Sequence, residues 1–80
     1  MRYIAVEWVG EKPDEKEIYE HVQKVLGITG FVHSKFRIIN GILACDRKWV
    51  DKVRGALALR WQFRVKKISG TLKKAKSVSQ

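Results

Sequence analysis

Residues 35–45, with the sequence KFRIINGILAC, decide the fold. Asn40-Gly41 at their centre favours a two-residue type I′ turn, because both residue types tolerate the positive φ angles that this turn requires. Such a turn joins two antiparallel strands and fixes their register. The expected pairs are Ile39 with Ile42, Ile38 with Leu43, Arg37 with Ala44 and Phe36 with Cys45. This register gathers Phe36, Ile38, Leu43 and Cys45 on one face, which we expect to be the core face of a sheet.

A strand and a helix are expected before this hairpin. Residues 2–9 alternate between apolar and other side chains, which is typical of a strand with one buried face. Pro13 suits a first helical position, and acidic residues follow it in the first turn. Apolar residues then recur at helical spacing as far as Gly27, which we expect to end the helix as a left-handed cap.

A second helix and a fourth strand are expected after the hairpin. Asp46 is a suitable N-cap for a helix whose apolar stripe includes Trp49, Val53 and Leu57. Gly55 within this helix costs up to ~1 kcal/mol relative to Ala, so we expect close packing there. Residues 62–69 alternate until Ile68 falls out of phase, which indicates a β-bulge near Lys66-Lys67.

The resulting βαββαβ order predicts an α+β fold. We expect a ferredoxin-like sandwich, in which two helices cover one face of a four-stranded antiparallel sheet. Residues 1–70 are expected to form this domain, and residues 71–80 a basic C-terminal tail with a mobile end. The other face of the sheet is expected to lie open and to present an apolar strip. Such strips mark interfaces, so we expect a protein interface at Tyr3, Ala5, Ile39, Ile42 and Ala44.

The charge of the chain is distributed unevenly. Its 17 Lys and Arg against 8 Asp and Glu give a net charge of +9 and a pI near 10.1. Residues 1–30 hold more acids than bases, whereas residues 31–80 hold 13 bases and 2 acids. This imbalance predicts a polyanionic partner, with nucleic acid favoured over an anionic membrane surface. The expected RNA-binding residues are Lys35, Arg37, Arg47, Lys48, Arg64, Lys66, Lys67, Lys73, Lys74 and Lys76. Lysines on edge strands also prevent aggregation, which is the competing explanation for some of them.

The sequence offers no convergent set of reactive groups. Cys45 is the only cysteine and is expected to be buried, while His21 and His33 are scattered, so we expect neither a catalytic nor a metal site in this chain. Residues 27–30, GITG, match the spacing of a KH-domain loop, but a helix cap explains them. The absence of a disulfide and of any run of ~18 apolar residues predicts a cytoplasmic protein, or a nuclear one in a eukaryote, without a membrane partner.

Three stretches resemble the ribonuclease P protein component 2 family, which is archaeal with eukaryotic relatives. Residues 2–7, RYIAVE, are similar to its first strand, and residues 41–59, GILACDRKWVDKVRGALAL, to its third strand and second helix. Residues 68–76, ISGTLKKAK, resemble its serine-glycine-threonine-hydrophobic-basic signature. The chain is shorter than is usual for the family, with a minimal hairpin and almost no link near Arg60-Trp61.

The resemblance implies a ferredoxin-like fold and a role as a protein subunit of ribonuclease P. In that ribonucleoprotein the RNA and its bound Mg²⁺ cleave precursor tRNA at the 5′ end, and the protein binds no cofactor itself. It also implies component 3 and other protein subunits as partners, beside the RNA and precursor tRNA. A second copy of this chain is a further candidate for the apolar strip. The alternatives are a ribosomal or general RNA-chaperone module and a small acylphosphatase-like enzyme, although the latter would need a phosphate-binding loop that residues 9–13 do not form.

Overall fold

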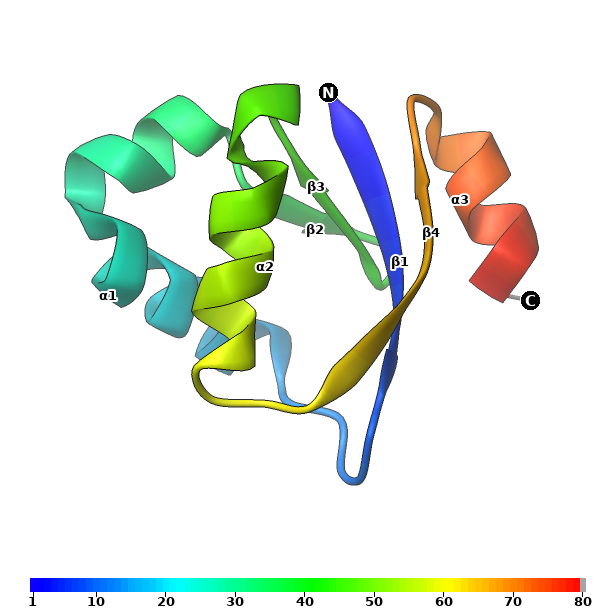
Figure 1. Ribbon diagram of the computed structural model, residues 1–80, viewed down its shortest axis with the longest axis horizontal. Helices are drawn as coiled ribbons and strands as arrows, with labels where there is room; N and C mark the ends of the chain where they lie inside the picture. The colour runs from blue at the N-terminus through cyan, green and yellow to red at the C-terminus, as the bar shows by residue number, and fades with distance from the viewer. Residues whose placement is uncertain (80) are drawn as a thin grey trace.

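The computed structural model describes residues 1–79 as a single sheet with helices on both sides (Figure 1). In chain order, the elements are β1 (Arg2–Trp8), α1 (Glu15–Ser34), β2 (Arg37–Ile39), β3 (Ile42–Cys45), the 3₁₀ helix η1 (Arg47–Trp49), α2 (Val50–Ala58), β4 (Phe63–Ser69) and α3 (Leu72–Ser79). The sequence predicts the four strands, α1 and α2 but neither α3 nor a separate η1, and the expected α+β class with a four-stranded antiparallel sheet is confirmed.

The four strands lie in the order β2-β3-β1-β4, and each pairs antiparallel with its neighbours. The predicted hairpin register is confirmed for the pairs Ile39 with Ile42, Ile38 with Leu43 and Arg37 with Ala44. Asn40 has a φ of 51° and Gly41 a φ of 79°, as a type I′ turn requires. The strand that begins the chain is therefore internal, while β2 and β4 form the edges.

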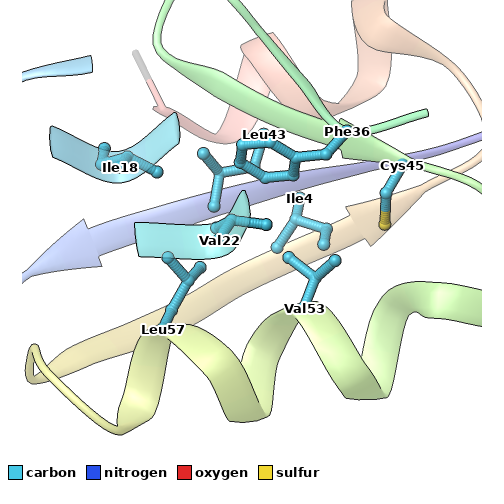
Figure 2. Packing of buried hydrophobic residues seen from close by; sticks show 8 residues of the cluster. All are labelled: Ile4, Ile18, Val22, Phe36, Leu43, Cys45, Val53 and Leu57. Carbon is cyan, nitrogen blue, oxygen red and sulfur yellow. The ribbon is translucent and has the colours of Figure 1, made fainter. Parts of the chain in front are cut away.

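The main core lies between the sheet and the pair α1 and α2. Ile4 of β1 and Leu43 of β3 meet side chains from both helices, as Figure 2 shows. Phe36 and Cys45, predicted for the core face, are buried there too. Full burial of a large aliphatic side chain contributes about 1.5–3 kcal/mol, so this layer supplies most of the driving force for folding. The buried set is Ile4, Ile18, Val22, Phe36, Leu43, Cys45, Val53 and Leu57.

Helix α1 consists of two helical segments that meet at a kink at Gly27. That residue is non-helical, with a φ of 79° and a ψ of 165°, but the chain resumes a helical path and continues to Ser34. The continuation is stabilised by Phe31, whose ring packs against the rings of Tyr19 and Phe36. The left-handed cap stands instead at Lys35, with φ 55° and ψ 33°. The positive φ and the helix end predicted at Gly27 are therefore confirmed for the first helical segment, whereas the second segment, which runs on to Ser34, was not predicted.

The expectation of an open sheet face is also wrong. Helix α3 packs on the side of the sheet opposite α1 and α2 (Figure 1). Ala75 of α3 is fully buried in a second, smaller cluster with Ala5 and Ile42, and Tyr3 and Leu72 pack against it. The predicted tail thus contains a helix, because Leu72 and Ala75 are three residues apart and face the same way.

Candidate nucleic-acid interface

The predicted bulge in β4 is confirmed and determines where its basic side chains point. Val65 pairs with Val6 and Lys67 pairs with Ala5, so Lys66 is the extra residue between two regular pairs. Ala5 contacts α3, and its cross-strand partner Lys67 therefore lies on the α3 side of the sheet. The cross-strand pair of Arg64 with Glu7, two residues along β1 from Ala5, lies on that side as well.

The residues of the ISGTLKKAK stretch form the turn from β4 into α3 and the start of that helix. The backbone N–H of Thr71 donates to Ser69 Oγ at 3.2 Å, and the backbone N–H of Lys74 donates to Thr71 Oγ1 at 3.4 Å. Thr71 is therefore the N-cap of α3. At Gly70 the backbone comes close to Arg2, since a Cβ there would lie 3.2 Å from Arg2 Nη1, and the Arg2 side chain would have to shift slightly. This short stretch both starts α3 and holds it against the sheet.

Helix α3 adds three lysines to the bases of β4. Lys73 and Lys74 are exposed and Lys76 is half-buried, while Ala75 between them faces the sheet. The first turn of α3 contains no acidic residue, so the charges of its lysines add to the positive end of the helix dipole. We call the resulting surface the β4–α3 surface. It comprises Arg64, Lys66, Lys67, Lys73, Lys74 and Lys76.

One acid lies within the β4–α3 surface. Glu7 Oε1 is 4.0 Å from Arg64 Nη1, and Glu7 Oε2 is 3.9 Å from Lys66 Nζ. All three side chains are solvent-accessible, with 78% of the Arg64 side chain and 52% of the Glu7 side chain exposed. Ion pairs this exposed contribute about 0–1 kcal/mol each. The two cations are therefore held only weakly by the carboxylate.

The remaining predicted RNA-binding residues lie elsewhere. Arg47 and Lys48 are exposed on η1, where Asp46 caps the helix by accepting a hydrogen bond from the Lys48 backbone N–H at 2.9 Å. That hydrogen bond, with nearby Lys35 as a smaller influence, lowers the pKa of Asp46. Lys35 and Arg37 are exposed beside the opposite sheet edge, β2. The structure thus places six of the ten predicted bases on the β4–α3 surface, and the other four lie on η1 and beside β2.

Of the three residues with potentially reactive side chains, Cys45 and His21 are held by packing and His33 is not. Cys45 is fully buried, and burial raises the pKa of its thiol to about 11. His21 Nε2 donates to the carbonyl oxygen of Ala56 at 2.7 Å, and its ring lies edge-on to Trp61. His33 is exposed. Within residues 1–79, no group of three or more His, Cys, Asp or Glu side chains is placed to hold a metal ion.

Several features of the surface could not be read from the sequence. No atom lies within 4 Å of the position that a Cβ of Gly55 would occupy, so the expected close packing there is wrong. Gly55 instead lines a groove of about 590 Å³ between α2 and β4, together with Trp61 and Phe63. The ion pairs of Glu7 with Arg64 and Lys66 were also not predicted, although the alternation of β1 places Glu7 on the same face as Ala5. These ion pairs follow from the pairing of β1 with β4, which sets Glu7 opposite Arg64.

The predicted apolar strip is largely buried within the chain. Ala5 and Ala44 are 0% exposed and Ile42 is 2% exposed, while Tyr3 and Ile39 are half-buried. Large exposed apolar side chains occur instead on α1, at Val25, Ile28 and Val32, and just after α2, at Leu59. None of the helices in residues 1–79 is long and apolar enough to cross a membrane.

Comparisons with known proteins point to one family. A protein of Thermococcus gammatolerans named ribonuclease P protein component 2 is 34% identical over 94 residues, which covers 94% of this chain and 78% of the relative. A protein of Thermococcus kodakarensis with the same name is 32% identical with the same coverage. No family model matches the chain.

Proposed function

The chain belongs to the ribonuclease P protein component 2 family, and from this premise we propose that it supports the catalytic RNA of ribonuclease P in removing the 5′ leader of precursor tRNA. The observation that carries this proposal is the β4–α3 surface, which gathers six bases from two consecutive elements, two of them paired with Glu7. A surface of this kind suits RNA phosphates, because Lys and Arg neutralise them and release counterions. Compaction of the RNA would follow from that neutralisation.

In this proposal the protein positions RNA and performs no chemistry. The thiol of Cys45 is buried and protonated, and His21 is held in the packing between α1 and α2. The Mg²⁺ ions for phosphodiester hydrolysis would be bound by the RNA, and component 3 and other subunits would complete the particle. We also propose that the β2-β3-β1-β4 sheet with α1 and α2 on one side is a ferredoxin-like sandwich to which α3 is added.

The contacts with RNA are proposed to be contacts with phosphates. Base readout by stacking needs exposed aromatic rings, and Tyr3, the aromatic residue beneath α3, packs against the Ala5–Ile42–Ala75 cluster. Phosphate contacts carry no sequence information, so the specificity of the particle would come from the shape of its RNA and from its other subunits.

This lack of base readout also favours a second candidate function, a general RNA chaperone. The two are separated by reconstitution with the ribonuclease P RNA and component 3 of the same source, followed by measurement of precursor-tRNA cleavage. A subunit of ribonuclease P raises the cleavage rate at moderate Mg²⁺ and binds its RNA in preference to an unrelated one. A chaperone binds both RNAs alike and leaves cleavage unchanged, which would contradict the proposal.

A further inference from the structure

We propose that Glu7 is an internal competitor of RNA phosphates, which occupies Arg64 and Lys66 in the free protein and thereby limits indiscriminate RNA binding. This inference rests on the proposed RNA-binding function and adds a residue that determines its strength. It starts from the charge arrangement: both ion pairs identified among the described residues converge on this one carboxylate.

The position of Glu7 follows from the pairing of two strands. It lies directly across from Arg64 in the β1–β4 ladder, which brings the side chains of the two residues together on the α3 side of the sheet. Lys66 reaches the same carboxylate because it lies two residues after Arg64 and therefore on the same face of β4. The bulge between the pairs Val6–Val65 and Ala5–Lys67 brings Lys67 to this face as well, so a regular strand would have one cation fewer here.

The contacts have the strength that a competitor requires. At 4.0 Å and 3.9 Å, between side chains that remain exposed, the two ion pairs are weak enough for a phosphate to replace the carboxylate. A carboxylate that remained beside a bound phosphate would repel it, and a like charge at ~6 Å in water alters affinity by about threefold. RNA that places several phosphates on the neighbouring bases overcomes this repulsion, whereas RNA that makes one or two contacts does not.

Removal of the charge tests the inference. In Glu7→Gln the side chain keeps its shape, and Arg64 and Lys66 become free to bind phosphate. We expect affinity for the ribonuclease P RNA at about 0.1 M salt to rise about three- to tenfold. For an unrelated duplex of similar length, which does not displace the carboxylate in the parent, the slope of log affinity against log salt should steepen by ~0.7–1.8 as one or both cations gain a phosphate contact. Affinity for that duplex should rise by more than affinity for the ribonuclease P RNA, which reduces the preference between the two RNAs.

The matched control is Glu20→Gln, which changes the net charge equally. Glu20 is exposed on α1, the helix that covers the opposite side of the sheet from α3 (Figure 1), and exposed charges farther apart than about 10 Å are largely screened at 0.1 M salt. We expect less than a twofold change. A second test repeats Glu7→Gln in a chain that also carries Arg64→Gln and Lys66→Gln. If Glu7 acts through these two cations, most of the gain in affinity disappears in that background.

The possible results distinguish a failure of the role inferred for Glu7 from a failure of the proposed RNA-binding function. If Glu7→Gln lowers RNA affinity while thermal unfolding is unchanged, the carboxylate positions the two cations for RNA and the inference is overturned. Equal effects of Glu7→Gln and Glu20→Gln would overturn it too, while leaving RNA binding in place. If the parent chain binds neither RNA, the proposed function and this inference both fail.

Discussion

Thr71 Oγ1 accepts a hydrogen bond from the backbone N–H of Lys74 at 3.4 Å, and this bond caps the helix that covers the second face of the sheet. Loss of an N-cap hydroxyl costs about 0.5–2 kcal/mol. We expect Thr71→Ala to loosen α3 without unfolding the sheet, since α1 and α2 pack on the other side. Hydrogen exchange at residues 74–76 should accelerate, while exchange in β1 stays slow. Thr71→Ser retains the hydroxyl and should behave like the parent.

Ile42 is 2% exposed beneath α3, so a charge at this position has no route to solvent while the helix is in place. Burial of an unpaired carboxylate is among the most destabilising changes known, and we expect Ile42→Asp to cost at least about 3 kcal/mol. Urea unfolding measures this loss. Ile39→Asp, at a half-buried position of the same hairpin, is the control and should cost clearly less. Equal and small losses would show that α3 does not cover this face in solution.

The lysines of α3 provide a test of the β4–α3 surface. Replacement of Lys73, Lys74 and Lys76 by Ala should weaken RNA binding and reduce the salt slope by roughly two to three units if all three contact phosphate. The helix should persist, because Ala has the highest helix propensity. The charge-matched control replaces Lys12, Lys16 and Lys24, which lie on or before α1. If both triple variants lose affinity equally, net charge rather than this surface governs binding.

Burial of Cys45 predicts a specific loss of stability in alkaline solution. The folded thiol has a pKa raised to about 11 from an ordinary value of 9.0, so it stays protonated where the unfolded thiol ionises. Its contribution to stability is complete below pH 9 and is lost as the pH rises toward 11, on the order of 2 kcal/mol in all. Between pH 8 and 11, the free energy of unfolding should decrease less for Cys45→Ala than for the parent. Parallel pH profiles would contradict this assignment.

Local signals in the sequence were enough for most of the sheet. The Asn40-Gly41 turn has a single favourable geometry, and the phase shift at Ile68 is a direct result of the inserted Lys66. The fold class and the bulge could therefore be predicted. Asp46 as a helix cap followed from the same kind of local rule.

Features that depend on tertiary contact could not be predicted. Gly27 has the expected positive φ, but only the packing of Phe31 against two distant rings explains why the helix continues beyond it. In helix α3, Ala75 is buried and Leu72 partly buried against the sheet, a pattern too short to identify without the sheet beneath it. The basic residues were recognised individually, but their division into a β4–α3 surface and separate groups depends on strand pairing.

The central place of β1 in the sheet has a consequence for how the molecule is made. β1 is synthesised before both of its partners, and its pairs with β3 and β4 join residues as far apart as Tyr3 and Ser69. Closure of such long loops slows folding, and a ribosome adds only about 5–20 residues per second. The first strand must therefore wait several seconds, unpaired, until β4 emerges. Lys66 and Lys67 take their places only when β4 completes the sheet, and α3 packs after that. The ordered cationic surface is therefore among the last parts of this structure to form.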